Sequence, residues 1–231
     1  MVEKDVKNIV FITSGQARRN GVSKTYDKEV DGMDNIRQIG VLDGLTHDEA
    51  VSIVGAQPGE HVLTSRLLSG KYVVMSQEKV EKRLQSIIDK LEESDVDVIS
   101  ILCTGSFENL HTRKAQLIEA EKITIPYSKI KFEGKKIGIM VPLKSQISDS
   151  RAKWNLGERC AMVSASPYMF DEQKFKEASL KLVRSGVDVI ILDCMGYNSD
   201  IARYISIYSN GIPVIQSNEL FFRYISEEVN I

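Results

Sequence analysis

The sequence predicts an α/β protein with two similar lobes, each built on a parallel sheet, and a ligand cleft between them. Two observations carry this prediction. Residues 96–105, VDVISILCTG, return without a gap as residues 187–196, VDVIILDCMG. Around both copies, short apolar runs alternate with helical patterns, which is typical of parallel sheets joined by right-handed crossovers. The duplication favours two lobes of similar construction.

The first half follows the order strand, helix, hairpin, helix. The run 8–13 is continuously apolar, as expected for a strand covered on both faces. Thr46 and Glu49 have the spacing of a capping box, and apolar residues recur every three or four positions in 77–93. The expected elements are a strand at 8–13, a helix near 46–54, a hairpin of 61–65 with 71–75, and a helix over 77–93 that leads into the first repeat.

The second half follows a similar alternation of strands and helices. Gly186 is placed to stop a helix just before the second repeat, and Asn218 is placed to cap a final helix. The expected elements are strands at 135–141, 160–165 and 212–215, and helices at 148–154, 171–185, 199–208 and from 218 onward.

The turn Glu133-Gly134 gives the predicted boundary. It divides the chain into an N-terminal lobe, residues 1–133, and a C-terminal lobe, residues 134–231. A final helix that packs back on the first lobe is common in such folds, so we expect the last helix to cross the boundary.

Composition narrows the function classes. Hydrophobic residues make up 42% of the 231 positions and charged residues 27%, which are ordinary values for a soluble domain. The net charge of −2 gives little support to nucleic-acid binding. Apolar runs stay below the ~20 residues that span a bilayer, so no membrane partner is expected. Three cysteines without a CxxC pair do not make a disulfide framework, and we expect a cytoplasmic protein with reduced thiols.

Each repeat ends in Cys-x-Gly and delivers a thiol, Cys103 or Cys194, to the carboxyl end of a strand. Open α/β sheets bind ligands at that end. A thiolate suits proton abstraction beside a carboxylate, and donors at a turn or helix start lower its pKa. The alternative interpretation is that both cysteines are small core residues, as buried cysteines usually are. Cys160 lies within a predicted strand, where we expect it to be core.

Other candidate residues follow strand ends. Arg18 and Arg19, after a glycine turn, could hold a carboxylate or could be solvated. The tripeptide 166–168 could line a pocket or be a plain turn, and the polar segment 24–36 could be a flap or a solvated loop. His47, His61 and His111 lack metal-ligand spacing, so no metal is expected. Nucleotide-binding and serine-hydrolase motifs are absent, and no cofactor is expected.

Several phrases, in order along nearly the whole chain, together resemble the AroM family. They are TSGQ (13–16), LDGLT (42–46), LCTGSF (102–107), MVPL (140–143), AKW (152–154), SASPY (164–168) and LDCMGY (192–197). AroM proteins resemble the aspartate/glutamate racemase superfamily, which includes amino-acid and hydantoin racemases, maleate isomerase and arylmalonate decarboxylase. The resemblance implies two flavodoxin-like lobes related by a pseudo-two-fold axis, with the active site between them.

The resemblance also assigns roles to residues. Cys103 and Cys194 match the first-lobe and second-lobe thiols, Ser14 matches a hydroxyl that holds the substrate carboxylate, and Thr104 and Gly105 match the turn whose backbone binds it. Two departures stand out. The racemases generally carry Cys-Thr-His at the second thiol, where this chain has Cys-Met-Gly, and Asn-Thr after the first thiol is here Thr-Gly. The AroM name itself implies only a link to aromatic amino-acid biosynthesis.

The leading hypothesis is a cofactor-independent racemase- or isomerase-like enzyme that acts on a small carboxylate through Cys103 and Cys194. The expected substrate-binding residues are Ser14, Gln16, Arg18, Thr104, Gly105, Ser166, Met195 and Gly196. The alternatives are a non-catalytic metabolite-binding protein, favoured by the missing histidine, and an interaction protein whose cleft is incidental. Relatives often dimerise, so a homodimer is an open expectation.

Overall fold

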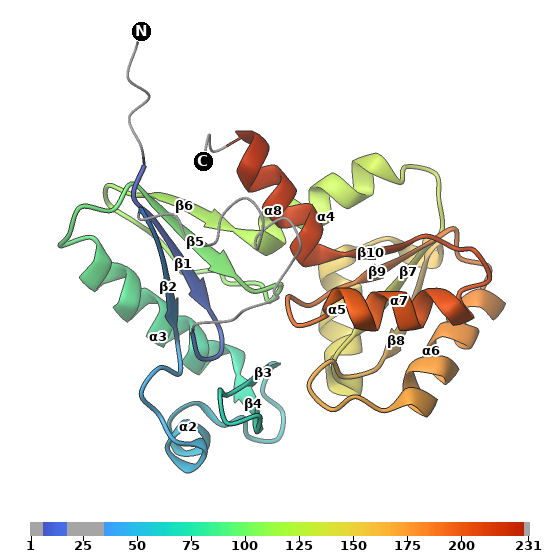
Figure 1. Cartoon of the computed structure of the whole chain (residues 1–231), viewed down its shortest axis with the longest axis horizontal. Helices are drawn as coiled ribbons and strands as arrows, with labels where there is room; N and C mark the ends of the chain where they lie inside the picture. Colours follow the sequence, from blue (N-terminus) through green and yellow to red (C-terminus); the bar gives the residue numbers. More distant parts are fainter. Residues whose placement is uncertain (1–6, 18–34, 229–231) are drawn as a thin grey trace, which may run out of the picture.

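A computed structural model describes residues 7–17 and 35–228. It contains two separate four-stranded parallel sheets, one in each half of the chain, and a small antiparallel hairpin (Figure 1). The predicted fold class, two α/β lobes with parallel sheets, is confirmed.

The two sheets have the same strand order. The first runs β2-β1-β5-β6 and the second runs β8-β7-β9-β10. Counting only the strands of each sheet in chain order, the first and third lie side by side at the centre of both. The strands are β1 (Ile9–Thr13), β2 (Ile36–Gly40), β5 (Val98–Leu102) and β6 (Gln116–Glu119), then β7 (Ile137–Val141), β8 (Cys160–Ser164), β9 (Val189–Leu192) and β10 (Val214–Gln216). The repeated phrase therefore builds the same strand of each lobe, β5 and β9.

Helices cover both faces of each sheet. Alternate side chains of β1 enter two different cores: Val10 and Ile12 pack with α3 (Gln77–Leu91), while Ile9 and Phe11 pack with α8 (Ser217–Glu228). In the second lobe, α6 (Glu172–Arg184) and α7 (Ser199–Tyr208) cover one face, and α5 (Ile147–Trp154) covers the other. Burial on both faces explains why these strands read as continuous apolar runs.

Two helices link the lobes at their seam. The last helix, α8, sends Phe221, Phe222 and Ile225 into the core of the first lobe. Its counterpart after β6, the last strand of the first sheet, is α4 (Ala120–Lys131), which places Ile125 against the second sheet. The two helices lie side by side (Figure 1). The boundary at residue 133 stays a prediction.

The first lobe carries an insertion that the second lacks. Between β2 and β5 the chain forms α2 (His47–Val54) and the hairpin of β3 (Val62–Arg66) with β4 (Tyr72–Ser76) before α3. The corresponding connection in the second lobe, from β8 to β9, contains α6 alone. The hairpin lies at the end of the lobe where the strands finish (Figure 1).

Local signals placed several element ends correctly. Thr46 and Glu49 form the predicted capping box, and Gly186 follows α6 with a left-handed φ of 66°. Asn218 lies inside α8 rather than before it, because α8 starts at Ser217 directly after β10. Asn218 still accepts a hydrogen bond from the Glu219 N–H at 2.7 Å.

Sequence patterns did not predict β2, β6 or α4. The two strands lie at sheet edges and are short, with polar residues among the apolar ones. Helix α4 carries Pro126 within it and mixes polar with β-branched residues, which are weak helix signals. Tertiary packing, rather than local propensity, selects these three elements.

The described residues, 7–17 and 35–228, contain no helix both long and apolar enough to cross a membrane.

Candidate active site

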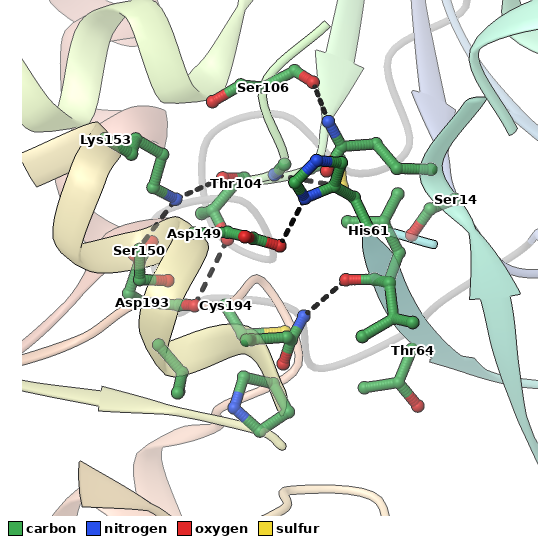
Figure 2. Close-up of a pocket in the computed structure, with 18 of the residues that line it drawn as sticks. Ser14, His61, Thr64, Thr104, Ser106, Asp149, Ser150, Lys153, Asp193 and Cys194 are labelled. Carbon is green, nitrogen blue, oxygen red and sulfur yellow. Dashed lines mark hydrogen bonds and ion pairs between the residues drawn. The ribbon is translucent and has the colours of Figure 1, made fainter. Parts of the chain in front are cut away.

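A cavity of about 310 Å³ lies between the lobes. Its wall comes from the ends of β1 and β5, the β3–β4 hairpin, the ends of β7 and β9, and helix α5 (Figure 2). Both sheets thus present their carboxyl ends to one space, as ligand sites in open α/β sheets do. The wall combines apolar side chains with a few polar and charged groups, a composition typical of small-molecule pockets.

Cys103 and Cys194 both line this cavity, one from each lobe. Their turns are alike: the Gly105 N–H donates to Cys103 Sγ at 3.4 Å, and the Gly196 N–H donates to Cys194 Sγ at 3.4 Å. The repeated Cys-x-Gly sequence thus builds the same thiol-holding turn twice. Cys103 is buried and Cys194 is half-buried.

Burial, together with the negative charge of an ionised Cys194, raises the pKa of the Cys103 thiol to about 11. The Gly105 N–H, a hydrogen bond with Ser14 and the positive charge of Lys153 act in the opposite direction but are outweighed. At neutral pH Cys103 is therefore a protonated thiol, which can donate a proton but is a weak nucleophile.

Cys194 has a different neighbour. The Tyr168 hydroxyl lies 3.4 Å from Cys194 Sγ. Tyr168 follows β8 and itself lines the cavity. Gly196 stands where the resemblance implies a histidine, and the polar side chain that the structure places against the second thiol is Tyr168.

Lys153, on α5, ties the two cysteine turns together. Its ammonium donates to the Thr104 carbonyl at 2.6 Å and pairs with Asp193 Oδ2 at 3.0 Å (Figure 2). Thr104 directly follows Cys103, and Asp193 directly precedes Cys194. Thr104 Oγ1 also donates to the Asp193 carbonyl at 3.2 Å. One half-buried cation therefore contacts both turns.

Asp193 is the most enclosed charged group of the site, with 1% of its side chain exposed. Its Oδ2 accepts a second hydrogen bond from Trp154 Nε1 at 2.7 Å, while Oδ1 has no hydrogen-bond partner within the described structure. A buried carboxylate requires its cation, because an unpaired buried charge is costly. Lys153 and Asp193 are thus mutually dependent.

The rim of the cavity carries two further contacts between the lobes. His61 Nδ1, at the start of the hairpin, lies 2.8 Å from Asp149 Oδ2 on α5, and Gln146 Nε2 donates to the Val62 carbonyl at 3.2 Å (Figure 2). The hydrogen bond and charge of Asp149 raise the pKa of His61 above its usual value. These contacts hold the first-lobe insertion over the cavity.

Five of the other predicted residues lie at the cavity or directly beside it. Ser14, Thr104, Gly105 and Met195 line the cavity with the cysteines, and Gly196 lies behind Cys194 against Tyr168. Met195 also packs into the apolar core of the first lobe.

Two predicted residues lie away from the cavity wall. The Gln16 amide donates to the carbonyls of Leu42 and Leu45 and accepts from the Leu68 N–H, so it joins three loops. Ser166 Oγ accepts from the Tyr168 N–H at 3.3 Å and shapes the turn that carries this tyrosine. Arg18, Arg19 and residues 24–34 of the polar segment 24–36 lie outside the described residues.

Sequence reasoning missed His61, Asp149, Lys153 and Asp193 as cavity residues. One sequence signal was available for Asp193, because the equivalent position in the first copy of the repeat is Leu102. Charged residues are almost never fully buried without a partner, so an acid at the end of a buried apolar run indicates a paired group. His61 and Asp149 are 88 positions apart in the chain, and only the folded hairpin brings them together.

Cys160 lies in β8, buried among the apolar residues of the second lobe and apart from the cavity. Burial raises the pKa of its thiol to about 11. The described residues hold no cluster of three or more His, Cys, Asp or Glu side chains that could bind a metal ion.

With this geometry in place, the comparisons give the family. The model of the AroM protein family matches residues 9–229. The chain belongs to the AroM family. A search of curated protein sequences finds no match for this family member.

Solved structures share the fold. Glutamate racemase from Bacillus anthracis matches with a TM-score of 0.60 at 15% identity, covering 97% of this chain and 82% of that one. Glutamate racemase from Francisella tularensis, in complex with D-glutamate, matches with a TM-score of 0.60 at 11% identity, over 97% and 81%. An arylmalonate decarboxylase matches with a TM-score of 0.52 at 13% identity, over 95% and 91%. This AroM-family chain therefore has the two-lobed racemase fold.

Proposed function

We propose that this AroM-family protein is a cofactor-independent racemase- or isomerase-like enzyme that acts on a small carboxylate between Cys103 and Cys194. One observation carries the proposal: two thiols, held by the same Cys-x-Gly turn in each lobe, line one cavity. Proton removal from one face of a carbon and proton return to the other face require two such groups on opposite walls.

The mechanism follows from the different surroundings of the thiols. The Cys194 thiolate takes the proton from the carbon beside the carboxylate, and the electron pair left on that carbon delocalises into the carboxylate. The Cys103 thiol, protonated at neutral pH, gives its proton to the opposite face. The step ends with a Cys194 thiol, a Cys103 thiolate and the inverted or isomerised product.

Binding and orientation come from the wall. Ser14, Thr104 and Gly105 line the cavity beside Cys103, so the proposal assigns the substrate carboxylate to this side of the cavity, where the Lys153 ammonium adds positive charge. Met195 contributes an apolar surface. Charge that develops on the carboxylate during proton removal is stabilised most by donors that are already in place.

The test is hydrogen exchange in D₂O. A panel of chiral amino, hydroxy and aryl carboxylates is incubated with the protein, and loss of the α-proton signal is followed by NMR. We expect exchange in at least one compound, loss of that exchange in Cys103→Ala and Cys194→Ala, and its retention in Cys160→Ala, a matched thiol outside the cavity. Undiminished exchange in both cavity variants contradicts the proposal.

A second candidate, a non-catalytic binding protein for a small metabolite linked to aromatic amino-acid metabolism, is favoured by the protonated state of Cys103 and by the lack of histidine at position 196. Such a protein is stabilised by its ligand without exchanging the α-proton. A compound that raises the melting temperature but keeps its α-proton indefinitely supports this candidate over the enzyme.

A further inference from the structure

We propose that Tyr168 is a positioning residue for the second thiol: its hydroxyl donates a hydrogen bond to the Cys194 thiolate and holds it ready as the base, and Gly196 provides the space for its ring. This inference rests on the proposed function and adds to it a residue outside the Cys-x-Gly repeat, together with a fixed direction of the first proton transfer.

The first argument is the direction of the hydrogen bond. Tyr168 Oη and Cys194 Sγ lie 3.4 Å apart, within the range for a bond to sulfur. A phenol ordinarily ionises near pH 10 and a thiol near pH 8.5. The proton of the pair therefore stays on Tyr168 Oη when one of them ionises, and the oxygen donates to a sulfur anion. The Gly196 N–H is a second donor to the same sulfur.

The second argument is the fit between Gly196 and the tyrosine ring. A Cβ atom at position 196 would lie 2.5 Å from Tyr168 Oη and 2.6 Å from Tyr168 Cζ, closer than real contacts allow. Gly196 does not belong to the glycines with positive φ, so the backbone does not require glycine there. The absence of a side chain at position 196 is instead what admits Tyr168 to the thiol.

The third argument is how Tyr168 is held. Its N–H donates to Ser166 Oγ at 3.3 Å in the turn that follows β8. Pro167 fixes one backbone dihedral between the two residues. Ser166 and Pro167 therefore help to fix the orientation of the Tyr168 ring. This gives Ser166 an indirect role at the site, although it does not line the cavity.

The comparison with Cys103 shows what Tyr168 adds. Both sulfurs accept one backbone N–H at 3.4 Å, but Cys103 is buried beside an aliphatic hydroxyl, Ser14, and its thiol stays protonated. Cys194 is less buried and faces a phenol. Hydrogen bonds to a charged form favour that form. The hydrogen bonds and the lower burial thus favour Cys194, rather than Cys103, as the thiolate of the pair.

The first experiment needs no substrate. In Cys103→Ala/Cys160→Ala, Cys194 is the sole remaining thiol of the three, and its ionisation is followed by thiolate absorbance and by the rate of alkylation with iodoacetamide against pH. Adding Tyr168→Phe should move the midpoint up by about one pH unit and slow alkylation about tenfold below the midpoint, since one unit is a tenfold change in thiolate.

The matched control is Tyr204→Phe, which removes the hydroxyl that donates to the Glu172 carbonyl at 3.1 Å, away from the cavity. It should leave the midpoint unchanged. An unchanged midpoint in a folded Tyr168→Phe variant overturns the proposal. Because this readout is independent of turnover, it stands even if no exchanged compound is found, and a shifted midpoint without any exchange would refute only the enzymatic function.

The second experiment is a double-mutant cycle on thermal stability. Gly196→Ala should lower the melting temperature of the otherwise unchanged protein, because the new Cβ displaces the tyrosine ring. In a Tyr168→Ala background the same substitution should cost little, because the ring is gone. Equal losses in both backgrounds mean that Gly196 serves the backbone instead, and the clearance argument fails.

Discussion

The two lobes share a strand order and a thiol-holding turn, yet the residues next to the cysteine make different contacts in each lobe. In the first lobe Thr104, after Cys103, reaches across with a hydrogen bond to the Asp193 carbonyl. In the second lobe Met195, after Cys194, reaches across with an apolar side chain that packs into the first-lobe core. Both copies thus keep the turn, and in both the residue after the cysteine contacts the other lobe. The contact is a polar one for Thr104 and an apolar one for Met195.

The same divergence holds for the residue before each cysteine. Leu102 is part of an apolar core, whereas Asp193 is paired with Lys153 and Trp154. The residue directly before the thiol is therefore apolar in the first lobe and a charged, hydrogen-bonded carboxylate in the second. Two similar halves thus make a site with unequal sides, and the proposed mechanism gives the two thiols different roles.

The largest expected effect comes from weakening the packing of α8, the last helix, against the first lobe. Phe222 of α8 is fully buried and contacts Phe11 edge-on, with ring centroids 5.6 Å apart. Phe222→Ala should lower the free energy of unfolding by about 3–5 kcal/mol, because it opens a cavity in the first lobe. Urea unfolding followed by circular dichroism measures it.

The matched change in the other linking helix is Ile125→Ala in α4, which packs on the second sheet. It should cost about 2–5 kcal/mol. If Phe222→Ala leaves the unfolding midpoint where it was, α8 does not hold the first lobe as described.

The next effect tests the unequal turns by making the second resemble the first. Asp193→Leu copies Leu102 and leaves the Lys153 ammonium, 13% exposed, without its carboxylate. Breaking a buried pair on one side costs about 3–5 kcal/mol, less here if Lys153 turns toward the cavity. Chemical denaturation gives the value.

The partner variant Lys153→Met/Asp193→Leu removes both charges and should recover most of the loss, because replacing a whole buried pair by apolar residues is often near neutral. A double variant as unstable as Asp193→Leu alone would show that the pair is not the reason for the loss.

A smaller effect concerns the insertion that the first lobe has and the second lacks. Thr46→Ala removes one half of the capping box of α2 and should cost about 1 kcal/mol. Thr46→Ser keeps the hydroxyl and should be close to the parent protein. Thermal unfolding compares the three, and equal melting temperatures for all of them would deny the cap its role.

The smallest effect is the pH response of the rim. Asp149 raises the folded-state pKa of His61 above its ordinary value near 6.5. The contact therefore stabilises the fold fully below about pH 6.5 and loses this contribution as the pH rises through the raised pKa. NMR of the His61 ring should show the raised midpoint, and Asp149→Asn should return it to the ordinary value. A His61 midpoint at or below 6.5 in the parent protein would show that His61 and Asp149 do not form this ion pair.

Strong local signals translated directly into structure. The continuous apolar runs gave β1, β5, β7 and β9, the spacing within 77–93 gave α3, and Thr46 with Glu49 gave the start of α2. The edge strands β2 and β6 and the helix α4 were missed, because their residues do not show a clear period of two or of 3.6. The identities of the two thiols and of Ser14, Thr104 and Gly105 came from sequence, while Lys153, Asp193, Asp149 and His61 did not.

By itself the sequence determined the duplication, the strand-end position of each thiol, the two-lobed α/β class and the resemblance to the AroM family. These depend on local patterns and on a repeat that can be read without coordinates. Only the tertiary structure decided what stands beside each sulfur: Tyr168 against Cys194, Ser14 against Cys103, and Lys153 joining the two turns. The physical reason is that a thiol's protonation follows from burial and from donors within a few ångströms. The side chains that act on the two thiols are distant in the chain: Tyr168 is 26 positions from Cys194, and Ser14 is 89 positions from Cys103.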